Sequence, residues 1–282
     1  MLRSILLGLC VSATLITTHA DAVSDTISKY SQQLHKLDRD FVSETTINES
    51  NNSNKLFEHV QADLPDSYGI TQTFMNKFNP SHNTNDHKRL ANEIDAYCKY
   101  LEKQPVIQFA LSKTNTTIQD LKKNWFGSGR GFEHVFPGEL KGSKVSGYHF
   151  WYKYYQDQQQ GKVQYGRSME GLNDSNIFTG SFSWDPDGKG GKKAARKKKG
   201  GFTIGSSAPA IIALGHVALE TKRQSGHNGS AMKFKASLNG HEYLWQMYIM
   251  GGGVRSLFPM VMRTREDEAS INRFKNLYSV EN

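Results

Sequence analysis

The spacing of apolar residues changes near Gly127, and this change constrains the fold more than any other feature of the chain. Before it, apolar side chains recur at the spacing of amphipathic helices; after it, they alternate with polar ones as in half-buried strands. Helices that precede antiparallel sheet indicate an α+β protein. We expect helices over residues 23–126 and mainly β structure over 127–282.

Three segments of the first half carry helix signals. Apolar residues repeat at helical spacing over 27–41, and a clearer amphipathic helix is predicted over 88–104. Thr117 followed by Asp120 is a capping pair for a third helix. The polar stretch 43–54 reads as a loop or linker.

The second half carries strand signals. Apolar and polar residues alternate over 178–184 and again over 232–238. Asn239-Gly240 then predicts a tight hairpin turn, with 243–247 as the returning strand. The apolar, small-residue-rich run 208–219 predicts a buried helix between the sheets.

The first 22 residues are typical of a signal peptide. Arg3 gives a positive start, residues 5–16 are mainly apolar, and cleavage is expected after Ala20 or Ala22. The alternative is an uncleaved membrane anchor, but the apolar run is short for a bilayer span. We therefore expect an exported protein whose mature domain covers 23–282.

The formal net charge of the chain is +8, and loss of residues 1–22 removes one Arg and one Asp, which leaves it unchanged. A positive field attracts polyanions, so nucleic acid and anionic membrane surfaces are the candidate partners. Charge alone does not choose between them. No segment after the signal is long and apolar enough to insert stably in a membrane.

Two short segments place a histidine between large apolar residues and close to glycines. They read Gly-Phe-Glu-His-Val-Phe over 131–136 and Val-Ser-Gly-Tyr-His over 145–149. A single histidine in such a setting is more often a hydrogen-bonded core residue than a catalyst. Two histidines in matching contexts, His134 and His149, weaken that interpretation without removing it.

These two segments resemble the signatures of the EndoU endoribonuclease family. The resemblance extends to Ile-Gly-Ser-Ser over 204–207, similar to the family's Ile-Gly-Thr-Ser element, and more weakly over most of 30–282. It implies that His134 and His149 are catalytic, that a basic catalytic cleft lies between β-rich lobes, and that single-stranded RNA is cut 3′ to uridines.

The chemistry that the resemblance implies suits these residue types. In RNA the 2′-hydroxyl attacks the adjacent phosphate, which requires a base, an acid for the departing 5′-oxygen, and a cation beside the phosphorane. Histidine fits the first two tasks because its usual pKa lies near neutrality, and lysine fits the third. The products are a 2′,3′-cyclic phosphate and a 5′-hydroxyl. As a working assignment, His149 is the acid and His134 the base.

Which residue corresponds to the family's catalytic lysine depends on the alignment. The family's lysine precedes the Ile-Gly-Thr-Ser element, and a count without gaps places it at Lys197, whereas a shift of one or two residues selects Lys198 or Lys199. All three belong to a basic tract over 189–199, which either is a solvated loop or grips the RNA backbone through counterion release. We favour RNA contact for Lys198 and Lys199.

Three further residues are expected near the substrate. Where the family has a tyrosine-proline pair, this chain has Phe258-Pro259, and phenylalanine can stack on a base or ribose but cannot donate a hydrogen bond. Ser256 resembles a hydroxyl residue that helps to read uracil. Glu133 either orients His134, holds a divalent cation or pairs with Arg130. The resemblance implies a use of Mn²⁺, although the sequence shows no metal-ligand spacing.

Two other functions remain open from the sequence. A degenerate relative would bind RNA or another polyanion without cutting it, and the tyrosine-to-phenylalanine difference supports that alternative. A secreted hydrolase of another class would cut DNA or other phosphoesters that lack a 2′-hydroxyl. The main hypothesis is an RNA-cleaving, DNA-sparing monomer without membrane insertion.

Overall fold

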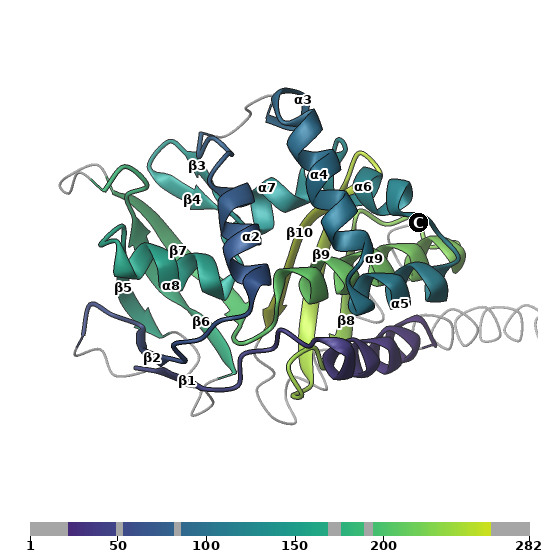
Figure 1. The fold of residues 1–282 in the computed structure, drawn as a ribbon, viewed down its shortest axis with the longest axis horizontal. Coiled ribbons are helices and arrows are strands. Elements are labelled where there is room, and N and C mark those ends of the chain that lie inside the picture. The colour runs from purple at the N-terminus through teal and green to yellow at the C-terminus, as the bar shows by residue number, and fades with distance from the viewer. Residues whose placement is uncertain (1–21, 49–52, 82–85, 169–175, 189–193, 261–282) are drawn as a thin grey trace, which may run out of the picture.

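The structure is a computed structural model, and it describes residues 22–48, 53–81, 86–168, 176–188 and 194–260. The expected signal segment therefore lies, except for residue 22, outside the described residues. In Figure 1 one group of strands lies at the left of the view and another near its centre, with helices beside and between them. Helices and antiparallel sheets confirm the predicted α+β class.

The helices occupy both halves of the chain. Residues 22–37 are helical, and the later helices are α2 (Asp66–Met75), α3 (Asp86–Arg89), α4 (Ala91–Glu102), α5 (Pro105–Thr114), α6 (Ile118–Phe126), α7 (Gly131–Val135), α8 (Trp151–Gln159) and α9 (Ala208–Gln224). The prediction over 88–104 is confirmed by α4, although Leu90 separates α3 from it. The Thr117–Asp120 capping box is present at the start of α6.

The strands within the described residues form three sheets. They are β1 (Thr45–Ile47), β2 (Phe57–Val60), β3 (Glu139–Lys141), β4 (Lys144–Ser146), β5 (Val163–Ser168), β6 (Ile177–Trp184), β7 (Ala195–Thr203), β8 (Ala231–Ala236), β9 (Tyr243–Met250) and β10 (Gly253–Met260). One sheet has the order β3-β4-β7-β6-β5, another β10-β9-β8, and β1 pairs with β2. Neighbouring strands are antiparallel except β4 and β7, which run parallel.

The strand predictions are confirmed with two corrections. The alternating segment 178–184 lies in β6, and 232–236 lies in β8. Ala236 pairs with Tyr243, so the hairpin connection covers residues 237–242 and is wider than a two-residue turn. The expected loop 43–54 contains β1, a three-residue strand too short to show alternation in the sequence.

Helix α9 is the centre of the helical part of the molecule. It is buried almost along its whole length and packs against α2, α5, α6 and strand β10, which confirms the prediction of a buried helix at 208–219. The indole of Trp125 donates to the Ile212 carbonyl at 2.9 Å. A Cβ at Gly215 would lie 2.4 Å from the Trp125 ring, so only glycine permits this close packing. None of the helices among the described residues combines the length and the apolar character that a bilayer span needs.

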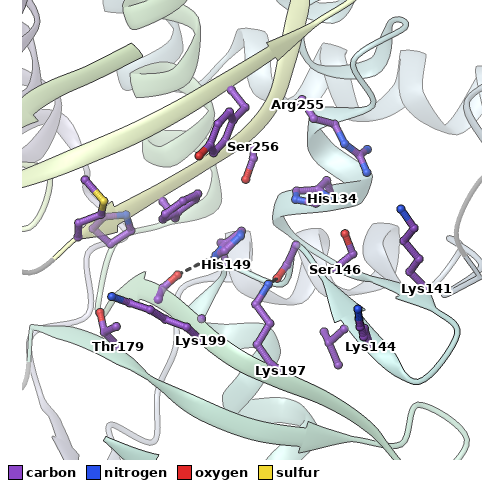
Figure 2. Close-up of a pocket in the computed structure, with 18 residues that line it drawn as sticks. His134, Lys141, Lys144, Ser146, His149, Thr179, Lys197, Lys199, Arg255 and Ser256 are labelled. Carbon is purple, nitrogen blue, oxygen red and sulfur yellow. Dashed lines mark hydrogen bonds between the residues drawn. The ribbon is translucent and has the colours of Figure 1, made fainter. Parts of the chain in front are cut away.

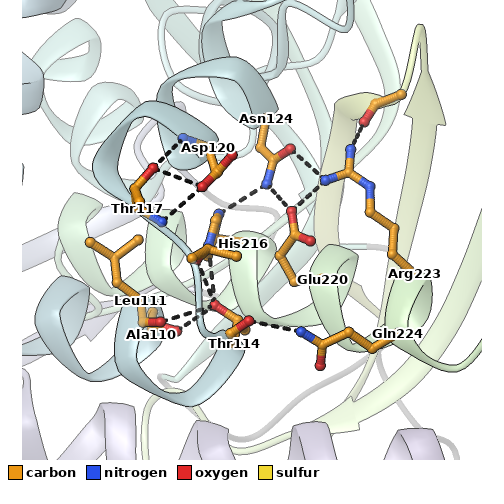
Figure 3. Close-up of polar contacts among 12 residues, drawn as sticks. Ala110, Leu111, Thr114, Thr117, Asp120, Asn124, His216, Glu220, Arg223 and Gln224 are labelled. Atoms are coloured by element: carbon orange, nitrogen blue, oxygen red, sulfur yellow. Dashed lines mark hydrogen bonds and ion pairs between the residues drawn. The ribbon is translucent and has the colours of Figure 1, made fainter.

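A buried histidine links α9 to the neighbouring helix ends (Figure 3). The ring of His216 is fully buried, and burial lowers its pKa to about 4, so the imidazole is neutral. Asn124 donates to Nδ1 at 3.0 Å, and Nε2 therefore carries the proton and donates to the Thr116 hydroxyl at 2.8 Å. Both ring nitrogens are thus satisfied inside the core.

The same network reaches the turn between β9 and β10. Asn124 donates to Glu220 at 2.7 Å and accepts from Arg223 at 2.9 Å. Arg223 also donates to Glu220 and to the carbonyl of Gly252, the residue before β10. Helices α6 and α9 therefore hold the start of β10, and β10 carries several residues of the site described next.

Candidate active site

A cavity of about 570 Å³ lies where the five-stranded sheet meets β10 of the three-stranded sheet. This volume is in the usual range for ligand sites. It is lined by His134, Lys141, Lys144, Val145, Ser146, Gly147, His149, Thr179, Lys197, Lys199, Gly200, Gly201, Tyr248, Arg255, Ser256, Phe258, Pro259 and Met260 (Figure 2).

The two histidines are joined through their backbones. His134 lies on α7, and His149 follows β4 after Gly147 and Tyr148, both of which have left-handed backbone angles. The Tyr148 amide donates to the His134 carbonyl at 2.8 Å, and the His149 amide donates to the Val135 carbonyl at 2.7 Å. These bonds bring the two rings within 6.0 Å, centroid to centroid.

His134 is held by a carboxylate that the sequence interpretation did not select. Its Nδ1 lies 2.8 Å from Glu139, a fully buried residue of β3. Arg255 on β10 donates to the same carboxylate at 2.6 Å. Burial alone would raise the pKa of Glu139, but the bonds from His134 and Arg255 outweigh it and lower that pKa to about 2.

The proton affinity of His134 results from opposing effects. Burial lowers its pKa to about 4, the hydrogen bond with Glu139 acts in the raising direction, and the nearby charge of Arg255 lowers it. The carboxylate therefore stabilises the imidazolium form whenever the ring is protonated.

His149 has a different environment. Its Nδ1 lies 2.9 Å from the Gly201 carbonyl, an acceptor only, so Nδ1 carries the proton. Its ring is stacked on Phe258, with centroids 4.7 Å apart. Burial, followed by the charges of Lys197 and His134, lowers the pKa of His149 well below its usual value. The neutral ring thus has Nε2 as its unprotonated nitrogen.

Strand alternation separates the three candidate lysines. Lys197 and Lys199 line the cavity, whereas Lys198 is exposed and does not line it. The Lys197 ammonium donates to the Gly147 carbonyl at 2.6 Å, and burial lowers its pKa to about 8, which still leaves it mostly charged at neutral pH. The part of the basic tract at 189–193 lies outside the described residues.

Of the remaining predicted residues, two line the cavity and one does not. Ser256 and Phe258 line the cavity from β10. Glu133 is only 2% exposed and is not among the lining residues, and the carboxylate that orients His134 is Glu139 instead. Tyr248 on β9, which the sequence interpretation did not select, is 47% exposed at the cavity, 6.3 Å from the Phe258 ring.

The cavity has a strong positive charge. Its described lining includes Lys141, Lys144, Lys197, Lys199 and Arg255 but no Asp or Glu. Such a surface attracts anions and concentrates them at the histidines.

The described residues do not fit the expected Mn²⁺. They contain no group of three or more His, Cys, Asp or Glu side chains placed to hold a metal. Glu139, the carboxylate bonded to His134, is also bonded to Arg255. This carboxylate is therefore already paired with protein groups.

Comparisons with known proteins agree on one family. A model of the family "Endoribonuclease XendoU" matches residues 22–259. A uridylate-specific endoribonuclease of Paralichthys olivaceus is 30% identical over 165 residues, which are 51% of this chain and 39% of that protein. The Homo sapiens uridylate-specific endoribonuclease is 35% identical over 109 residues, 34% of this chain and 25% of that protein. The matched regions cover less than half of these relatives.

A solved structure shows the same fold. The structure of XendoU, a splicing-independent snoRNA-processing endoribonuclease, is similar with a TM-score of 0.64 at 16% identity. The match covers 85% of this chain and 98% of that chain.

The junction between the two histidine segments should not tolerate a side chain at residue 147. A Cβ at Gly147 would lie 1.9 Å from the His134 carbonyl oxygen, whereas one at Gly161, which has a similar left-handed angle, meets nothing within 4 Å. We expect Gly161→Ala to cost about 1 kcal/mol of unfolding free energy and Gly147→Ala roughly 3 kcal/mol or more. Urea unfolding of both variants measures the difference. Equal losses of unfolding free energy would contradict the close contact between the two histidine segments.

Proposed function

The chain belongs to the XendoU endoribonuclease family, and on that basis we propose that it cuts single-stranded RNA 3′ to uridines by attack of the ribose 2′-hydroxyl. One observation carries the proposal. His134, His149 and Lys197 line one basic cavity, although they come from a helix, a loop and a strand. These are the groups that 2′-hydroxyl attack requires: a base, an acid and a cation.

The hydrogen bonds of the two rings favour a particular division of roles. His149 donates from Nδ1 to a carbonyl, and its neutral Nε2 is suited to accept the 2′-hydroxyl proton. His134 is paired with the Glu139 carboxylate, which favours the protonated form that donates to the departing 5′-oxygen. This is the reverse of the working assignment made from the sequence.

Lys197 would balance the charge of the phosphorane. Its ammonium is held by the Gly147 carbonyl, next to both histidine segments, and its partial burial strengthens its interaction with a phosphate oxygen. The products would be a 2′,3′-cyclic phosphate and a 5′-hydroxyl.

Uridine preference is supported by the uridylate-specific activity of the relatives and by the residues that β10 places in the cavity. Phe258 presents a ring already stacked on His149, and the exposed Tyr248 stands beside it. Stacking holds any base, whereas Ser256 provides a hydroxyl group that can read a base edge.

Removal of the three groups should abolish cleavage without unfolding the protein. We expect His134→Ala, His149→Ala and Lys197→Ala each to lower kcat/KM on a uridine-containing oligonucleotide by ~10²–10⁴-fold. Lys198→Ala is the matched control, because this neighbouring lysine does not line the cavity, and it should retain activity. Product analysis with Mn²⁺ and with chelator identifies the cyclic phosphate and any metal requirement.

A 2′-O-methyl uridine substrate separates the alternatives in the same assay. The proposed enzyme binds it but leaves it intact. Binding of both oligonucleotides with cleavage of neither would support an RNA-binding module, and cleavage of both, or of DNA, would indicate another class of hydrolase.

The role of Glu139 can be tested through the pH profile of kcat/KM. In Glu139→Gln the ring of His134 loses the charge that acts to raise its pKa. If His134 is the acid, activity depends on its protonated form, so the alkaline limb should move to lower pH and activity near neutrality should fall. If His134 is the base instead, the acidic limb should move to lower pH. The conservative substitution and a circular dichroism spectrum control for folding.

We propose in addition that the protein is exported. The support is the order of charge, apolar run and small residues at the N-terminus. Expression in a secretory host followed by intact mass measurement should give a chain that starts after Ala20 or Ala22. A protein that keeps Met1 and stays with the membrane would indicate an anchor.

A further inference from the structure

The hairpin of β3 and β4 brings two lysines face to face at the cavity. Lys141 and Lys144 are directly opposite each other across the turn, and both line the cavity with exposed side chains. Like charges at such positions destabilise a hairpin. Within the described part of the chain neither ammonium group has a carboxylate partner. A negatively charged ligand between them would remove this repulsion.

The hairpin lies at one end of the site (Figure 2). Thr179 and Lys199 lie toward one side of His149, whereas His134 and the hairpin lysines lie toward the other, and Ser256 lies above His149 in this view. The Thr179 end has the aromatic rings: Phe258 stacks on His149, whose Nδ1 is bonded to Gly201, the sheet partner of Thr179, and Tyr248 lies 6.3 Å from Phe258. The hairpin end has Lys141, Lys144 and Ser146, and the described lining residues of β3 and β4 include no Phe, Tyr or Trp. The Thr179 end therefore suits a base, and the hairpin end suits phosphate.

We propose that Lys141 and Lys144 form a phosphate subsite for the RNA strand on the 3′ side of the cleaved bond. This inference rests on the proposed function. The nucleotide that supplies the 2′-hydroxyl has its base at the aromatic end and its 3′-phosphate at Lys197 and the two histidines. The strand then continues past His134, the proposed acid, toward the hairpin.

The subsite would bind the next phosphate and not the one that reacts. Lys197 is partly buried and bonded to Gly147, whereas the hairpin lysines are exposed on long, flexible side chains. Exposed lysines contribute point charges whose effect depends on salt. The substrate class is therefore RNA that extends at least one phosphate beyond the leaving nucleotide.

Three substrates of defined length test the subsite. They are a uridine-containing dinucleotide, the same dinucleotide extended by one nucleotide at its 3′ end, and the same dinucleotide extended at its 5′ end. In the wild-type protein the 3′ extension should raise kcat/KM by roughly 10-fold, the size expected for one charge-assisted phosphate contact. In K141Q/K144Q this gain should fall to about 2-fold or less. Dinucleotide cleavage, which loses only the long-range attraction of the two charges, should fall by a smaller factor than cleavage of the 3′-extended substrate.

Two control variants keep the comparison specific. K99Q/K103Q removes the same charge from exposed positions on and after α4, away from the cavity lining, and should keep the full gain. K141R/K144R keeps the charge on the hairpin and should also keep it. Because K141Q/K144Q loses a like-charge pair, its melting temperature should equal or exceed that of the wild type.

Binding measurements make the result independent of cleavage. With 2′-O-methyl versions of the same oligonucleotides, the slope of log Kd against log salt concentration should become shallower by about 0.7 in K141Q/K144Q, for the 3′-extended ligand only. The proposal is overturned if the 3′ gain survives in K141Q/K144Q, if dinucleotide cleavage falls equally, or if the 5′ extension is the one affected. A wild-type protein that binds with the predicted slopes but cuts none of the RNAs would refute the proposed function and leave the subsite standing.

Discussion

The interlock of two backbone segments is the constraint on which the site depends. The carbonyls of His134 and Val135 accept hydrogen bonds from Tyr148 and His149, and this requires left-handed angles at residues 147 and 148. Glycine takes such an angle freely, but a left-handed tyrosine costs on the order of 1–3 kcal/mol. The phenol of Tyr148 is buried and donates to Asp157 at 2.6 Å, a contact that offsets the strain.

The hydrogen bond from Tyr148 to Asp157 is itself supported by an ion pair. Asp157 accepts from Lys153 at 2.6 Å, and the Lys153 ammonium lies 5.4 Å from the centre of the Trp184 ring and 5.7 Å from that of Tyr148. A buried carboxylate with two donors avoids the large cost of an unpaired charge. Helix α8, which carries both charged residues, thus stabilises the strained residue next to His149. Residues outside the cavity therefore help to fix the geometry of the two histidines.

The second constraint is the meeting of the two sheets. Arg255 on β10 and Glu139 on β3 are 116 residues apart in sequence. Their ion pair joins the two sheets, because the guanidinium of one sheet neutralises the buried carboxylate of the other. The start of β10 is held by Arg223 through Gly252, at the end of the buried network around His216 (Figure 3). The hydrogen-bond network around α9 therefore helps to position Arg255 beside Glu139.

These contacts explain what the sequence could and could not predict. The helix at 88–104, the capping box at Thr117 and the strand at 178–184 depend on local spacing, which a sequence displays directly. Each histidine box is likewise contiguous. Glu139 lies three residues after the first histidine box, but only its contacts with His134 and Arg255 in the folded chain distinguish it from Glu133. Because side chains alternate in β7, a one-residue ambiguity between Lys197 and Lys198 decides between the cavity and the solvent.

The charge of the cavity also couples proton binding to the binding of an anion. In the free protein, burial lowers the pKa values of His134, His149 and Lys197, and neighbouring positive charges lower those of the two histidines further. A phosphate among these groups adds negative charge where the cations repel a proton, and it therefore raises all three pKa values. His134 already has a carboxylate partner, so it needs less added negative charge than His149 to hold a proton. The empty site thus disfavours protonation of His134, the proposed acid. A bound RNA phosphate would favour this protonation, so the substrate itself would bring His134 into the form that the proposed reaction needs.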